Sequence, residues 1–288
     1  MKVLALSFVL CALSVLAQAG LDRAVGVPIP PHSQDPTRPD AKAGATRIAE
    51  GEYEVYEEGS NGAVGPFGEE VYDFHESWTM TRDSRGKYHV EGERRFRTSP
   101  GAPELKRPFV VELSRDLTMM EVTEYSKLKW IPDSGPLTCQ FLPGQMHCSA
   151  GGKKPSPSKD WQIEVQRPYG LLWPISPFSL GSVTRESERD PKIVTRASLL
   201  TIEQPSPSNP VSPTILTGEL QYLGAETFST ANRSWEAYKF SIKVPFHPKF
   251  VMWTSSKGML LALSVQHEHP EWPKEGLRLV RFTAFTDF

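Results

Sequence analysis

The sequence lacks several features that would name a function. Its formal net charge is −2, with 32 Lys and Arg against 34 Asp and Glu. Because these charges are interspersed, the chain has no basic footprint for nucleic acid. After Leu16 no apolar stretch is long enough for a transmembrane helix. The motifs G-x-S-x-G, H-E-x-x-H and the P-loop are missing. No motif therefore names a reaction, and no cofactor is expected.

The one long apolar run lies at the N-terminus. Lys2 precedes an apolar segment from Val3 to Leu16, and Ala17-Gln18-Ala19 follows it. This order is typical of a secretory signal peptide, with cleavage after Ala19. A membrane anchor is the alternative, but the run is shorter than the roughly 20 residues that span a bilayer. The sequence thus predicts a signal peptide over 1–19 and an exported protein, periplasmic or secreted.

The next segment, residues 20–49, is rich in proline and poor in large apolar residues. Such a stretch buries too little surface to offset the entropy lost on ordering. We expect a disordered leader here, followed by a single domain over 50–288.

From Glu50 onward the pattern becomes that of β-strands. In GKYHVEGERRFRT, Val90 and Phe96 fall on one parity, and in SWEAYKFSIKV Phe240 and Ile242 do the same. Strict alternation is typical of a strand with one buried face. Counting such segments between turn residues predicts about a dozen strands. The only helix candidate begins at Ser176-Pro177. We expect a mainly β fold with one large, strongly curved antiparallel sheet, a half-barrel or barrel-like arrangement.

The stretch TCQFLPGQMHC contains the two cysteines that follow the signal segment. If Pro143-Gly144 forms the turn, Cys139 lies directly opposite Cys148 in a non-hydrogen-bonded pair. In an exported protein the two would form a disulfide. A metal site would need more ligands than this hairpin supplies, and a redox pair usually has the spacing C-x-x-C.

Two histidines form a second candidate site. His267 and His269 share a face with Leu261, Leu263 and Val265. An i, i+2 pair on a strand can chelate a metal ion, with a third ligand from elsewhere. The alternative is that both histidines lie at the solvated end of a strand.

Aromatic residues supply the third candidate, because ligand pockets are largely apolar. Core packing is the alternative explanation for the same residues. If they line a concave cavity, the ligand-binding side chains are expected to be Trp173, Tyr238, Phe240, Trp253, Leu261 and Leu263.

Three stretches carry a family resemblance: GEYEVYEEGSNGAVG, LQYLGAETFSTANRSWEAYKFSI and FVMWTSSKGMLLALSV. Together they resemble uncharacterised exported bacterial β proteins of the lipoprotein-carrier (LolA/LolB-like) half-barrel group. The resemblance implies a curved sheet that holds acyl chains on its concave side under helices. This sequence has little helix from which to form such a lid.

The leading functional hypothesis is an exported, non-enzymatic protein that binds a hydrophobic or lipid-like ligand in its sheet. One alternative is an outer-membrane β-barrel, suggested by the terminal Phe288. Another is a secreted enzyme that depends on a metal or acts on carbohydrate. Asn232 matches a glycosylation sequon, whose use depends on the source organism.

Overall fold

The structure is a computed structural model. It describes residues 45–57, 63–64, 70–97, 101–124, 134–152, 159–173, 177–202, 213–245, 249–266 and 275–286, all within one unit, Ala41–Phe288. The strands are β1 (Thr46–Glu57), β2 (Ala63–Val64), β3 (Glu70–Arg82), β4 (Tyr88–Arg97), β5 (Leu105–Leu113), β6 (Met119–Glu124), β7 (Ser134–Leu142), β8 (Gln145–Gly152), β9 (Lys159–Glu164), β10 (Tyr169–Trp173), β11 (Val194–Ile202), β12 (Pro213–Thr230), β13 (Arg233–Lys243), β14 (Lys249–Ser255), β15 (Leu260–Gln266) and β16 (Glu275–Ala284). The helix is α1 (Gly181–Glu186).

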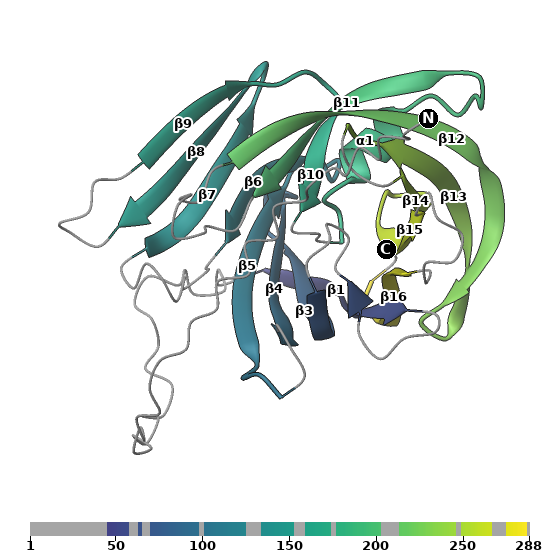
Figure 1. The fold of residues 1–288 in the computed structure, drawn as a ribbon, viewed down its shortest axis with the longest axis horizontal. Helices are drawn as coiled ribbons and strands as arrows, with labels where there is room; N and C mark the ends of the chain where they lie inside the picture. Colours follow the sequence, from purple (N-terminus) through teal and green to yellow (C-terminus); the bar gives the residue numbers. More distant parts are fainter. Residues whose placement is uncertain are drawn as a thin grey trace, which may run out of the picture. The chain divides into compact units, whose positions relative to one another are not determined.

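The described strands form one sheet, in the order β10-β11-β12-β13-β14-β15-β16-β1-β3-β4-β5-β6-β7-β8-β9, with β2 paired to β3 (Figure 1). All neighbours are antiparallel except β10 and β11. The expected mainly β fold with one large antiparallel sheet is confirmed. The sheet has 16 strands rather than about a dozen, because strands as short as β2 and β10 show too little alternation to be recognised in the sequence.

The sheet bends back on itself without closing. Its two edge strands, β9 and β10, are joined only by residues 165–168. At this junction the Val165 amide donates to the carbonyl of Gly144, between β7 and β8. The ring of Phe141 on β7 stacks on Tyr169 of β10, with centroids 4.9 Å apart. The short connection and β10 therefore contact the β7–β8 hairpin.

One face of the sheet supplies most of the core, as the alternation predicts. Val90 and Phe96 on β4 are buried, and so are Phe240 and Ile242 on β13. The neighbouring β5 contributes Phe109, Val111 and Leu113 to the same core. A sheet of this size must cover its apolar face, and strong bending places that face against itself.

A short buried segment, residues 177–187, fills part of the space inside the bend. Phe178, Leu180 and Val183 are all buried, and α1 lies beside β10 (Figure 1). The Leu260 amide at the start of β15 donates to the Pro177 carbonyl. The helix expected from Ser176-Pro177 is thus present but shorter, since residues 177–180 form turns and the helix begins at Gly181.

The sheet starts earlier than expected. β1 begins at Thr46, and Ile48 and Ala49 are buried in the core. These residues lie within the segment predicted to be leader, so the domain boundary at Glu50 is shifted toward the N-terminus. Burial of two apolar side chains explains the shift. The expected signal peptide lies outside the described residues. Among those described, no helix has the length and apolar character needed to cross a membrane.

Candidate functional site

The hairpin β7–β8 has the predicted register. Leu142 lies opposite Gln145, and Cys139 lies opposite Cys148. The two sulfur atoms are 2.04 Å apart, and the Cα atoms are 4.0 Å apart. Both cysteines are buried on the inner face, whereas His147 is exposed on the other. The disulfide is therefore a structural element of the core.

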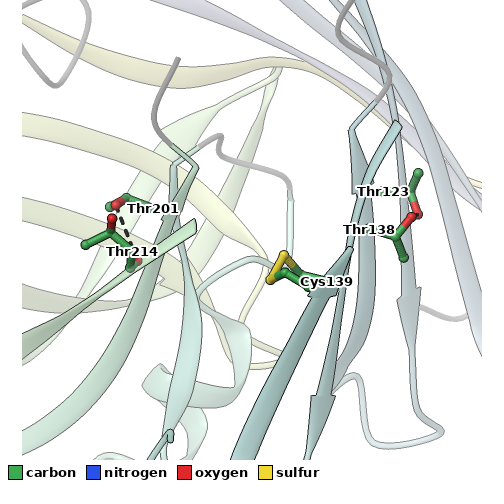
Figure 2. Close-up of a disulfide and its surroundings, with 6 residues drawn as sticks. Thr123, Thr138, Cys139, Thr201 and Thr214 are labelled. Atoms are coloured by element: carbon green, nitrogen blue, oxygen red, sulfur yellow. Dashed lines mark hydrogen bonds between the residues drawn. A yellow bond between two sulfur atoms is a disulfide. The ribbon is translucent and has the colours of Figure 1, made fainter. Parts of the chain in front are cut away.

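Threonine pairs lie on both sides of this disulfide (Figure 2). The hydroxyls of Thr123 on β6 and Thr138 on β7 are 3.1 Å apart. Thr138 precedes Cys139, so it occupies the opposite face of the strand. The Thr201 hydroxyl donates to the Thr214 carbonyl between β11 and β12. These hydroxyl contacts link neighbouring strands, whereas the disulfide lies on the buried apolar face.

Three of the predicted ligand-binding residues lie in the core. Phe240, Leu261 and Leu263 are 1%, 0% and 0% exposed. A side chain without accessible surface borders no water-sized space. A ligand would therefore reach these three residues only if the core opened.

Tyr238 and Trp253 are only partly buried, and they lie on opposite faces. Tyr238 pairs with Thr254, and Trp253 pairs with Lys239. Arg189 lies over the Tyr238 ring, 3.9 Å from its centroid. Trp173 ends β10, and its side chain lies outside the described part of the structure.

Trp253 belongs to a larger group that we name the aromatic row: Trp253, Phe228, Trp235, Phe282 and Trp78. Trp253 stacks on Phe228, with ring centroids 5.3 Å apart. Phe228 and Trp235 are direct cross-strand partners on β12 and β13. Trp235 meets Phe282 of β16 edge-on at 5.1 Å, and Phe282 is 6.3 Å from Trp78 of β3. Four of the five rings are partly exposed, and Trp78 is buried.

The bend of one hairpin builds the aromatic row. β12 and β13, the long curved strands in Figure 1, are joined by a turn at Ala231-Asn232, where φ is 51° and 56°. Positive φ at both turn residues is typical of a type I′ turn, which matches strand twist. The Thr230 hydroxyl donates to the Leu279 carbonyl of β16. The hairpin tip thus folds over onto β16 and brings Trp235 to Phe282.

Charged groups border the aromatic row. The Arg233 guanidinium lies 4.4 Å from the Trp235 ring and 5.6 Å from the Phe282 ring. The Lys239 ammonium lies 5.0 Å from the Trp253 ring and 3.5 Å from the Glu226 carboxylate. The Trp253 indole N–H donates to that same carboxylate. Such cation–π contacts place positive charge beside apolar surface.

A charged pair lies inside the core among apolar side chains. Arg94 on β4 donates through Nε to Oε2 of Glu76 on β3, at 2.7 Å. Its guanidinium lies over the Phe109 ring, 4.3 Å from the centroid. The sequence contained the signal, because Arg94 has the same parity as Val90 and Phe96.

Tyr53 on β1 lies beside this pair. Its hydroxyl donates to the Leu260 carbonyl at 2.7 Å. Burial, and secondarily the Glu76 charge, raise the pKa of Tyr53 well above its usual value. The phenol is therefore neutral at physiological pH and acts as a hydrogen-bond donor in the core.

The predicted metal ligands His267 and His269 lie outside the described residues. Within the part of the chain that the structure describes, no group of three or more His, Cys, Asp or Glu side chains is arranged to hold a metal ion. His75 on β3 is exposed, and its Nδ1 lies 3.5 Å from the carboxylate of Glu54 on the neighbouring strand.

Comparison with known proteins gives structural likenesses at low sequence identity. The chain is similar to a β-barrel-like protein of domain of unknown function DUF1849 from Brucella abortus, at 7% identity and TM-score 0.47, over 85% of this chain and 100% of that one. It is also similar to a DUF1089 family protein from Pseudomonas aeruginosa, at 15% identity and TM-score 0.42, over 66% and 87% of the two chains. No family model matches the sequence, and no curated protein matches it. Neither structure is described as a lipoprotein carrier.

Proposed function

We propose that the protein is an exported, non-enzymatic binding protein for a hydrophobic or amphiphilic, lipid-like ligand. The observation that carries this proposal is the aromatic row with its bordering cations. Four partly exposed rings from β12, β13, β14 and β16 lie in one continuous series. The ligand would bind along these rings rather than deep in the core, where Phe240 and Leu263 are 1% and 0% exposed.

The chemistry of the row favours an amphiphile. Aromatic side chains offer large apolar contact area at little cost in conformational entropy. Arg233 would attract an anionic headgroup at the border of that area, whereas the charge of Lys239 is offset by Glu226. An acyl chain along the rings with its charged end toward Arg233 would satisfy both parts of the site.

Export is part of the same proposal. It is supported by the signal-like order of residues 1–19 and by the Cys139–Cys148 bond, since disulfides persist in oxidising compartments. Fractionation of the source organism, with N-terminal sequencing of the purified protein, tests it. We expect a mature chain that begins at Gly20 and is found outside the cytoplasm.

Ligand binding is tested by titrating the full mature chain with dodecanoate below its micelle concentration, monitored by tryptophan fluorescence. We expect saturable binding by the wild type. Phe228→Ala should weaken it about tenfold, because loss of one aromatic contact of about 1.4 kcal/mol corresponds to that factor. Trp161→Phe is the matched control, since Trp161 is also partly buried but lies on β9.

Two results would contradict the proposal. One is the absence of saturable binding by the wild type, together with no co-purifying lipid in native mass spectrometry of protein from its own host. The other is equal weakening by Phe228→Ala and Trp161→Phe, which would place the ligand elsewhere.

A further inference from the structure

A polar pocket lies at the end of the sheet where β1 begins. Its volume is about 500 Å³, which is within the range of small-molecule sites. Three segments build it: the start of β1, the β3–β4 turn with its flanking residues, and the β5–β6 turn. Its lining residues are Thr46, Arg82, Asp83, Ser84, Gly86, Tyr88 and Arg115. This lining is chemically unlike the aromatic row, so the pocket is a separate candidate site.

Two guanidinium groups face this pocket from different segments. Arg82 is the last residue of β3, and Arg115 lies in the turn between β5 and β6. In the described part of the structure neither of them has an ion pair or a side-chain hydrogen bond. An arginine without a carboxylate partner keeps all its donors available for an anion.

The position of Arg115 depends on a glycine. Gly86 has φ of +83°, and a Cβ built on it would lie 2.9 Å from Nε of Arg115. The Arg115 side chain therefore packs directly against the Gly86 backbone, across from its own turn. A larger residue at position 86 would push the guanidinium away from the pocket.

Asp83 and Asp116 both accept hydrogen bonds from groups of their own turns. Asp83 accepts through Oδ1 from the backbone amides of Arg85 and Lys87, both at 2.9 Å. Asp116 accepts from the Ser114 hydroxyl, and this hydrogen bond is the main cause of its lowered pKa. The pocket is lined by two guanidinium groups, from Arg82 and Arg115, and by one carboxylate, so its lining carries net positive charge.

We propose that this pocket binds a phosphoryl group carried by a small organic phosphate or by a lipid headgroup. Planar guanidinium groups match phosphate oxygens with paired hydrogen bonds. The hydroxyls of Thr46, Ser84 and Tyr88 add neutral donors around the same space. The volume exceeds that of phosphate alone, and the Tyr88 ring supplies a face for the organic part of the ligand. The site is independent of the aromatic row.

Isothermal titration calorimetry of the full mature chain with glycerol 3-phosphate tests the proposal. We expect saturable binding that weakens as salt is added. Arg115→Gln and Arg82→Gln should each weaken it tenfold or more, as expected for loss of a charge-assisted hydrogen bond. Arg85→Gln is the matched control, because Arg85 lies in the β3–β4 turn between Ser84 and Gly86 but does not line the pocket. This variant should change the affinity less than twofold.

A second set of measurements distinguishes the two sources of the phosphoryl group. Binding to glycerol 3-phosphate that depends on Arg115 supports a small ligand. A lipid headgroup is supported by a different result: the protein co-sediments with phosphatidylglycerol vesicles but not with phosphatidylcholine vesicles, and it does not bind glycerol 3-phosphate. The co-sedimentation should be lost in Arg115→Gln. Gly86→Ala should weaken either interaction.

The proposal fails if neither probe binds, or if Arg85→Gln weakens binding as much as Arg115→Gln. The second result would show attraction to diffuse surface charge. Phe228→Ala should leave glycerol 3-phosphate binding unchanged. The proposal for this pocket and the proposal for the aromatic row can therefore fail independently of each other.

Discussion

The Arg94 guanidinium and the Glu76 carboxylate form an ion pair in the core, with 2.7 Å between Nε and Oε2 and with side chains 3% and 0% exposed. Removing one partner leaves the other charge buried. We predict that Arg94→Met lowers the free energy of unfolding by about 3–5 kcal/mol. The double variant Glu76→Leu/Arg94→Met should lose much less, because no charge then remains in the core. Urea unfolding of the wild type, Glu76→Leu, Arg94→Met and the double variant measures this, and a double variant that loses as much stability as the two single variants together would contradict it.

The Trp78 ring lies directly over Gly51 on the neighbouring strand. A Cβ built on Gly51 would lie 2.6 Å from Cζ2 of Trp78. Gly51→Ala should therefore overpack the core and lower stability by about 1–3 kcal/mol. In a Trp78→Phe background the smaller ring should reduce this penalty. Thermal or urea unfolding of the four proteins in the cycle gives the coupling, and an equal penalty in both backgrounds would argue against this contact.

His89 lies between two carboxylates on the outer face of the sheet. Its Nδ1 is 2.6 Å from Glu112, and its Nε2 is 2.9 Å from Glu91. Hydrogen bonds to Glu112 first and Glu91 second raise the pKa of His89 to about 9. A folded-state pKa above the unfolded value of about 6.5 means that protonation stabilises the fold. This stabilisation is complete below about pH 6.5 and is lost as the pH rises through about 9.

His89→Gln tests this pH dependence. Because the His89 side chain is 25% exposed, solvent screening reduces the effect, and we expect about 1–2 kcal/mol. The wild type should lose that amount of unfolding free energy, relative to the variant, between pH 6 and pH 9.5. Parallel stability curves for the two proteins over this range would rule the prediction out.

The disulfide closes a short loop, with a sequence separation of 9 between Cys139 and Cys148. Loop-closure entropy for this length predicts a loss of about 2–3 kcal/mol in Cys139→Ala/Cys148→Ala. Urea unfolding of the variant, and of the wild type with and without a reductant, measures it. A thiol assay on unfolded wild-type protein should find no free thiol at these two positions. If the reductant leaves wild-type stability unchanged, the bond contributes nothing.

Local patterns predicted much of the fold, and particular residues show why. The alternation around Val90 and around Phe240 identified the buried faces, because side chains of a strand alternate with period two. The turn at Pro143-Gly144 determined the register of its hairpin, because a tight turn fixes which residues of the two strands lie opposite each other. Arg94 shares the parity of Val90 and Phe96 but was not predicted to be buried, because a charged side chain in the core depends on a partner, Glu76, that only the structure shows.

The candidate sites could not be predicted in the same way. The polar pocket combines β1 with two turns, one of which contains Arg115, and no local pattern relates Thr46 to Arg115. The aromatic row joins rings from β3, β12, β13, β14 and β16. The sequence predicted Trp253 as a ligand-binding residue, but it predicted neither Phe228, which stacks on Trp253, nor Phe282, which contacts Trp235.

The sequence by itself determined the buried faces of clearly alternating strands such as β4 and β13, the pairing of Cys139 with Cys148, and the mainly β class. These properties depend on a period of two residues and on short turns, so they are local. Only the tertiary structure decided that β1 lies between β3 and β16, that the hairpin tip reaches β16, and that Arg82 and Arg115 face one pocket. Alternation identifies the buried face of a strand but not the strand that lies beside it. The packing of the whole bent sheet selects these long-range partners.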